Sequence, residues 1–177
     1  MPSQRSERAV GESPRIESYE RSIVSHSSTT PINEPEDRMQ AMSLHVSKLR
    51  GISLDIRNRL KRQGISYTHQ LLREAGGAEQ RSRLAERGRI DEMALARLVR
   101  RADLARVKGI GAIFADMLEM IEVDEVATLA EQQPAELHRR LYDLNSAERL
   151  ARRAPTPDEV QDWIAQARAL PRLVDAD

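Results

Sequence analysis

Residues 100–118 read RRADLARVKGIGAIFADML, and this stretch indicates how the chain folds. Apolar residues recur at helical spacing on both sides of the short glycine-containing segment 107–111, VKGIG. This is the pattern of two helices joined by a tight turn. Asp91 is a predicted N-cap for the helix before the turn. Thr156, Pro157 and Glu159 predict a further helix start with a capping box.

The same plan occurs twice in the chain. With a shift of 58 residues, Gly51-Ile52 aligns with Gly109-Ile110, and Leu60 aligns with Leu118. With a shift of 65, Leu98 aligns with Trp163, so the second copy carries about seven extra residues around 145–155. The repeat predicts two tandem helical units, 41–106 and 107–177, that pack as one all-α domain.

Composition supports this fold class. The 177 residues include 3% aromatics and no Cys, which disfavours a β-sandwich and excludes disulfides and thiolate zinc sites. No apolar run approaches the ~20 residues that span a bilayer, and no signal-peptide core is readable, so we expect a cytoplasmic protein. From Met39 to Leu49 the apolar spacing also predicts a helix.

Residues 1–40 are rich in Ser, Pro, Glu and Arg, which predicts a disordered tail or linker. One apolar island within it has helical spacing, so it is a candidate docking motif for a protein partner, with chance spacing as the alternative. Its residues are Ile16, Tyr19, Ile23 and Val24.

The formal net charge of zero conceals a gradient. Residues 1–40 carry a net charge of −2, residues 41–106 carry +8, from 15 basic and 7 acidic residues, and residues 107–177 carry −6, from 8 and 14. A basic half can face a polyanion such as nucleic acid. It can also pair with the acidic half, within one chain or head to tail between two copies. The third reading is a set of solvated helix faces that differ in sign.

The repeated unit resembles the helix-hairpin-helix fold, which is also described as SAM-like. The segment 107–111 matches its apolar-x-Gly-apolar-Gly turn, and 49–53, LRGIS, keeps one glycine of the two. Residues 44–170 resemble a bacterial domain-of-unknown-function family of paired helix-hairpin-helix units. The stretches 100–118 and 155–170, PTPDEVQDWIAQARAL, carry this resemblance most clearly.

Residues 53–72, SLDIRNRLKRQGISYTHQLL, are similar to the C-terminal DNA-binding domain of the RNA polymerase α subunit. In that family an Arg and an Asn at the start of the corresponding helix contact DNA. Asn58 matches the Asn, whereas Asp55 stands at the Arg position, where an acid facing a phosphate is unfavourable. Arg57, Arg59 and Arg62 could replace the missing cation only if they share that face, and at ~100° per residue Arg59 and Arg62 lie within one face of Asp55.

A glycine-rich hairpin leaves backbone amides open to a phosphate, and nearby Lys and Arg add an attraction that does not depend on sequence. The alternative is that the glycines only allow close helix packing. The candidate nucleic-acid-binding residues are Lys48, Arg50, Gly51, Arg57, Asn58, Arg59, Lys61, Arg62, Lys108, Gly109 and Gly111.

No catalytic or metal-binding pattern is present among the four His residues, and neither GxSxG nor a phosphate-binding GxxxxGK[ST] motif occurs. We therefore expect no cofactor, no metal and no enzymatic activity. Two functions stay open. The first is a protein-interaction or adaptor module with an unidentified protein partner or self-association. The alternative is an accessory protein that binds DNA without sequence specificity through its basic half.

Overall fold

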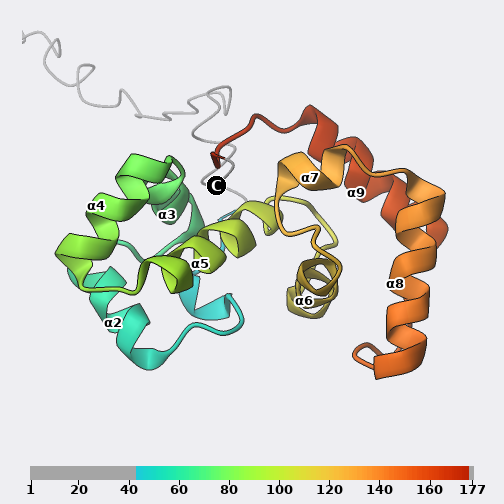
Figure 1. The fold of residues 1–177 in the computed structure, drawn as a ribbon, viewed down its shortest axis with the longest axis horizontal. Coiled ribbons are helices and arrows are strands. Elements are labelled where there is room, and N and C mark those ends of the chain that lie inside the picture. Colours follow the sequence, from blue (N-terminus) through green and yellow to red (C-terminus); the bar gives the residue numbers. More distant parts are fainter. Residues whose placement is uncertain (1–42, 176–177) are drawn as a thin grey trace, which may run out of the picture. The chain divides into compact units, whose positions relative to one another are not determined.

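The computed structural model describes residues 43–175, and within this range the chain is all-helical, as the sequence predicts. Figure 1 shows the helices in chain order. The candidate docking motif at residues 16–24 lies outside the described residues. The elements are the 3₁₀-helix η1 (Val46–Lys48) and the α-helices α2 (Leu54–Arg62), α3 (Thr68–Ala75), α4 (Ala78–Gly88), α5 (Glu92–Leu104), α6 (Ala112–Met120), α7 (Val126–Ala130), α8 (Pro134–Glu148) and α9 (Pro157–Ala169).

The predicted helix starts are confirmed by their capping bonds. The backbone N–H of Ala94 donates to Asp91 Oδ1 at 2.8 Å. The N–H of Glu159 donates to Thr156 Oγ1 at 3.2 Å, and the N–H of Thr156 donates to Glu159 Oε2 at 2.7 Å. These bonds satisfy amides that have no partner inside the helix, and they fix where α5 and α9 begin.

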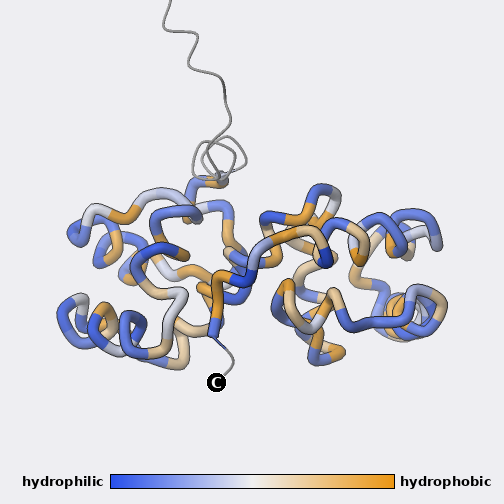
Figure 2. The backbone as a smooth tube through the Cα atoms, turned by 90° about the horizontal axis from the view of Figure 1, so that it is seen from above, coloured by the Kyte–Doolittle hydropathy of each residue, from blue (hydrophilic) through white to orange (hydrophobic). Residues whose placement is uncertain are grey.

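The apolar residues form two hydrophobic clusters, and α5 connects them. The first cluster includes Leu60, Leu71 and Leu95, and the second includes Leu118 and Trp163. Figure 1 shows α2, α3 and α4 on one side of α5 and α6 to α9 on the other, and in Figure 2 apolar stretches recur along the helices of both groups. The last residue of α5, Leu104, already belongs to the second cluster.

The C-terminal segment 171–175 returns to the first cluster. Val174 is buried there, and the N–H of Asp175 donates to Gly76 O at 3.1 Å. A Cβ at Gly76 would lie 2.1 Å from Leu173 O, so only glycine allows this approach. The segment thereby joins the end of the acidic half to the core of the basic half.

The predicted helix before Leu49 differs from the structure. Only Val46–Lys48 is helical, as a single 3₁₀ turn, and Met39 and Met42 lie outside the described residues. The backbone pairs with the segment before α3 instead, because Val46 N–H donates to Ser66 O at 2.9 Å and Thr68 N–H donates to Leu44 O at 2.8 Å. These non-local bonds override the local helical spacing.

Candidate nucleic-acid interface

Helix α2 presents four of the candidate residues on its solvent side. Leu60 is buried and Ile56 packs partly against the first cluster, so the opposite side of the helix faces solvent. At 100° per residue the four exposed candidates lie within an arc of about 140°. This outer face of α2 consists of Arg57, Asn58, Lys61 and Arg62.

Arg59 lies on the flank of α2 and is committed to the fold. Its Nε donates to Asp55 Oδ2 at 2.6 Å, and its Nη1 donates to Arg89 O at 2.7 Å. The second bond ties α2 to the turn before α5. The first bond pairs the Arg59 guanidinium with Asp55, the acid that stands where the polymerase α-subunit domain carries Arg.

The first hairpin turn, 49–53, is shaped around an arginine. Gly51 has φ +77°, and a Cβ there would lie 2.9 Å from Arg101 Nη1. That guanidinium donates to the carbonyl oxygen of Arg50. The Arg50 side chain remains mostly exposed, and its Nη1 contacts Asp116 Oδ2 at 2.5 Å.

The second hairpin turn, 107–111, packs against α9. Gly109 has φ +93°, and a Cβ there would lie 2.8 Å from Trp163 Nε1. The amide side chain of Gln166 bonds both backbone groups of Lys108: it accepts from the N–H at 2.8 Å and donates to the carbonyl at 3.2 Å. This use of Gly109 is the packing role that the sequence left as the alternative. No local motif marks Gln166 as a residue that holds this turn.

Parts of the two hairpin turns line one small groove. Lys48 ends η1 just before the first turn, Arg50 belongs to the first turn and Gly111 to the second, with Asp116 at the edge. The volume of about 60 Å³ holds a water or two but no nucleotide. The structure therefore brings Lys48, Arg50 and Gly111 together, whereas Gly109 faces α9.

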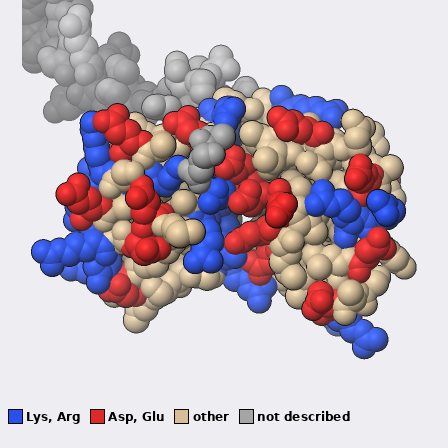
Figure 3. Space-filling view, viewed as in Figure 1, with Lys and Arg blue, Asp and Glu red and all other residues tan. Residues whose placement is uncertain are grey.

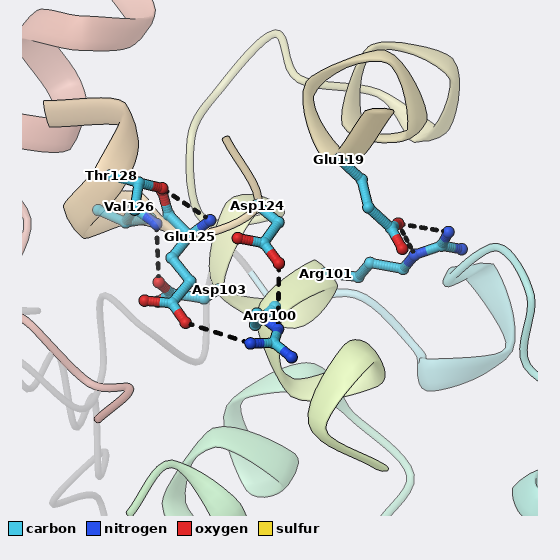
Figure 4. A network of polar contacts seen from close by, with 8 residues as sticks. All are labelled: Arg100, Arg101, Asp103, Glu119, Asp124, Glu125, Val126 and Thr128. Atoms are coloured by element: carbon cyan, nitrogen blue, oxygen red, sulfur yellow. Dashed lines mark hydrogen bonds and ion pairs between the residues drawn. The ribbon is translucent and has the colours of Figure 1, made fainter. Parts of the chain in front are cut away.

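Arginines of the basic half meet carboxylates of the acidic half across the boundary (Figure 4). Arg101 donates to Glu119 from Nε at 2.8 Å and from Nη2 at 2.5 Å. Arg100 Nε lies 3.1 Å from Asp124 Oδ2, and its Nη1 lies 3.9 Å from Glu125 Oε1. The Arg100 and Arg101 side chains are 24% and 20% exposed, so these pairs are less screened than surface pairs.

A buried carboxylate strengthens the same boundary. Asp103 is 2% exposed; its Oδ2 accepts from Val126 N–H at 3.0 Å and its Oδ1 pairs with Arg106. Arg106 in turn donates to Pro171 O at 2.6 Å. This chain of contacts links α5, the start of α7 and the C-terminal segment.

Six cations of the basic half are exposed and have no acidic partner within 4 Å among residues 43–175. They surround α2. Lys48 precedes this helix, and Arg57, Lys61 and Arg62 lie on its outer face. Arg89 belongs to the turn whose carbonyl accepts from Arg59, and Arg97 lines a cavity together with Ile56 of α2. Figure 3 shows basic and acidic side chains meeting in the middle of one face of the molecule, and further basic side chains away from this place. We call the six the basic set: Lys48, Arg57, Lys61, Arg62, Arg89 and Arg97.

Arg89 and Arg97 are additions to the sequence-based candidates. Arg89 occupies the left-handed region at the end of α4, and its carbonyl holds Arg59. Arg97 lies on α5 and becomes a neighbour of α2 only through folding. No local motif marks either residue, and a helical wheel of α5 places Arg97 simply on a polar side.

Ser43, at the start of the described residues, and His69 of α3 have a structural role. His69 Nδ1 lies 2.7 Å from Ser43 Oγ, and the same hydroxyl lies 3.2 Å from Thr68 Oγ1. Burial, and then the charge of Arg73, lower the pKa of His69. These bonds fasten the chain before η1 to the start of α3.

Neither a metal centre nor a membrane span emerges from the described part of the chain. Residues 43–175 contain no group of three His, Asp or Glu residues placed to hold a metal ion. None of their helices has the length and apolar character to cross a bilayer.

Comparison with known proteins places the chain in a family. No curated protein matches it, and no solved structure does. A family model, the domain of unknown function DUF4332, matches residues 50–170, from Arg50 in the first hairpin turn to just past the end of α9. The chain therefore belongs to the DUF4332 family.

Proposed function

We propose that this protein is a non-enzymatic accessory protein that binds duplex DNA, without sequence specificity, through the basic set around α2. One observation carries the proposal. Folding neutralises Arg50, Arg100 and Arg101 with carboxylates of the acidic half, yet it leaves the basic set exposed around a single helix. Exposed cations with no acidic partner favour a polyanionic ligand.

The expected binding is mainly electrostatic. Each neutralised phosphate contributes about −0.9 to the slope of log affinity against log salt concentration. If all six cations reach phosphates, the slope is about −5. Base readout is not expected to dominate, because only Asn58 on the outer face of α2 offers both an acceptor and donors.

The resemblances support the same ligand. The helix-hairpin-helix likeness and the likeness of residues 53–72 to the polymerase α-subunit domain both point to DNA. The doubt raised by Asp55 is smaller in the folded chain, because Arg59 pairs with it. Asn58, the residue that matches the polymerase pattern, is exposed on the outer face of α2.

Fluorescence anisotropy with a labelled duplex of about three helical turns tests the proposal, at low and at physiological salt. Arg57→Gln combined with Lys61→Gln should weaken binding and reduce the salt slope by about two. The matched control is Arg139→Gln combined with Arg152→Gln, which removes the same charge from exposed residues of the acidic half whose side chains make no hydrogen bond or ion pair within residues 43–175.

Two results would overturn this function. One is the absence of binding at low salt. The other is an equal loss in the control variant, which would mean that total charge, rather than the outer face of α2, sets the affinity.

The adaptor hypothesis has less support from contacts. Its candidate motif lies outside the described residues. Four carboxylates of the acidic half, those of Asp116, Glu119, Asp124 and Glu125, already contact arginines of the basic half within one chain, which leaves fewer for head-to-tail self-association. Capture of a partner by residues 1–40 alone, with no DNA binding by the full chain, would favour the adaptor.

A further inference from the structure

A second cavity lies between the first hairpin turn, α2 and α5, and three arginines surround it. Its volume is about 110 Å³. We propose that this cavity receives one phosphodiester group of the bound DNA, with Arg97 and Arg50 as its ligands; the inference rests on the proposed function. The lining residues are Arg50, Gly51, Ile56, Ala94, Arg97, Leu98 and Arg101.

The hydrogen-bond donors of this cavity exceed its acceptors. Arg101 already bonds the Arg50 carbonyl and Glu119, so it is a fixed wall. Arg50 uses one nitrogen, on Asp116. Arg97 is exposed and makes no hydrogen bond or ion pair with the described residues. No lining residue carries a carboxylate, hydroxyl or amide side chain, so no acceptor side chain of the lining competes with an anion for these donors.

The size and chemistry of the cavity favour a single oxyanion group. Pockets for whole small molecules begin at about 300 Å³, so about 110 Å³ is too small for a nucleotide. A guanidinium binds phosphate oxygens through two parallel N–H bonds. Ile56, Ala94 and Leu98 supply an apolar wall that offers no competing partner.

The charge balance favours a phosphodiester that is part of a polymer. On the side of the acidic half, Arg97 and Arg101 lie near Glu119 and Asp124. Four arginines, Arg50, Arg97, Arg100 and Arg101, therefore face four carboxylates, those of Asp116, Glu119, Asp124 and Glu125, and the local charge sums to zero. A free anion should therefore bind weakly, whereas a phosphodiester held nearby by α2 gains from its high effective concentration.

Arg97 is the residue to change, because its side chain makes no hydrogen bond or ion pair with the rest of the described chain. Arg97→Gln should lower duplex affinity about fivefold and reduce the magnitude of the salt slope by about one. Arg97→Lys keeps the charge but loses the two parallel N–H donors, so its duplex affinity should lie between those of the unaltered protein and Arg97→Gln. Arg152→Gln is the control and should match the unaltered protein.

A second measurement separates the cavity from the wider function. In NMR spectra of the full chain, the Arg97 side-chain N–H signals should move with added dimethyl phosphate, relative to sodium chloride of equal ionic strength. A glutamate-rich peptide is the competing anion and should move them less.

The outcomes are distinguishable. DNA binding with no effect of Arg97→Gln and no shift of Arg97 would overturn the cavity and leave the proposed function standing. A shift with dimethyl phosphate but no duplex binding would overturn the proposed function and keep an oxyanion site. A larger shift with the peptide would assign the cavity to a carboxylate and overturn the phosphodiester.

Discussion

Gly109→Ala and Gly111→Ala should have very different effects, although both glycines belong to one hairpin motif. Gly109 has φ +93°, and its added Cβ would lie 2.8 Å from Trp163 Nε1, in a side chain that is 1% exposed. Gly111 has φ −81°, and its added Cβ would meet nothing within 4 Å. The sequence pattern alone treats the two positions as equals.

The expected cost at Gly109 has two parts. A Cβ in a left-handed backbone conformation costs about 1–2 kcal/mol. Forcing an extra carbon into a packed core costs about 1–3 kcal/mol more. Gly109→Ala should therefore destabilise the fold by about 2–5 kcal/mol. Gly111→Ala should stay within about 0.5 kcal/mol, because a mildly worse N-cap is offset by a less flexible unfolded chain.

Urea unfolding followed by tryptophan fluorescence measures both effects. Trp163 is the only Trp in the chain, so its signal reports on the site of the expected clash. At a typical urea dependence of about 2 kcal/mol per molar, a 3 kcal/mol loss moves the midpoint by about 1.5 M. Equal stability of the two variants, with an unchanged Trp spectrum for Gly109→Ala, would refute the argument that Gly109 serves packing against α9.

Three further predictions concern the polar contacts. Asp103→Asn should cost about 3–5 kcal/mol in urea unfolding, because it leaves Arg106, 8% exposed, without its counter-charge; no change would contradict a structural role for this pair. Thr156→Ala should cost about 1 kcal/mol, whereas Thr156→Ser should cost little, since serine keeps the capping oxygen. The side chain of Arg153 and the amide of Thr156 lower the pKa of Glu159 to about 2, so its contribution to stability should be present above about pH 4.5 and fade toward pH 2; thermal unfolding of Glu159→Gln should lack that part of the acid dependence.

Features set by neighbours along the chain could be predicted from the sequence. The caps at Asp91 and Thr156 depend on residues three positions apart, and the helical spacing of apolar residues predicts the core position of Trp163. The exposure of Arg57, Asn58, Lys61 and Arg62 follows from Leu60 facing inward. Local chemistry determines all of these.

Features set by residues far apart could not be predicted. Arg50 contacts Asp116 across 66 positions, and Asp175 contacts Gly76 across 99. The opposite net charges of the two halves predicted that the halves could pair. They did not predict which arginines would contact the carboxylates. The prediction of a helix up to Leu49 was wrong for the described residues before Val46. Their backbone groups bond to the segment before α3, and these non-local bonds outweigh the local apolar spacing.

The two equivalent hairpin glycines explain why a basic surface belongs to one half only. Gly109 faces an indole, and its turn is held by Gln166, so the second hairpin turn is part of the apolar packing of α9. Gly51 faces the guanidinium of Arg101, and its turn opens on a cavity with unused donors. Carboxylates of the acidic half pair with Arg100 and Arg101, so they hold the arginine side of that cavity in place and do not line the cavity themselves. On this argument the acidic half acts as the structural support of the basic half. Removing Glu119 should then weaken DNA binding, although it raises the net positive charge, and simple electrostatic attraction predicts the opposite sign.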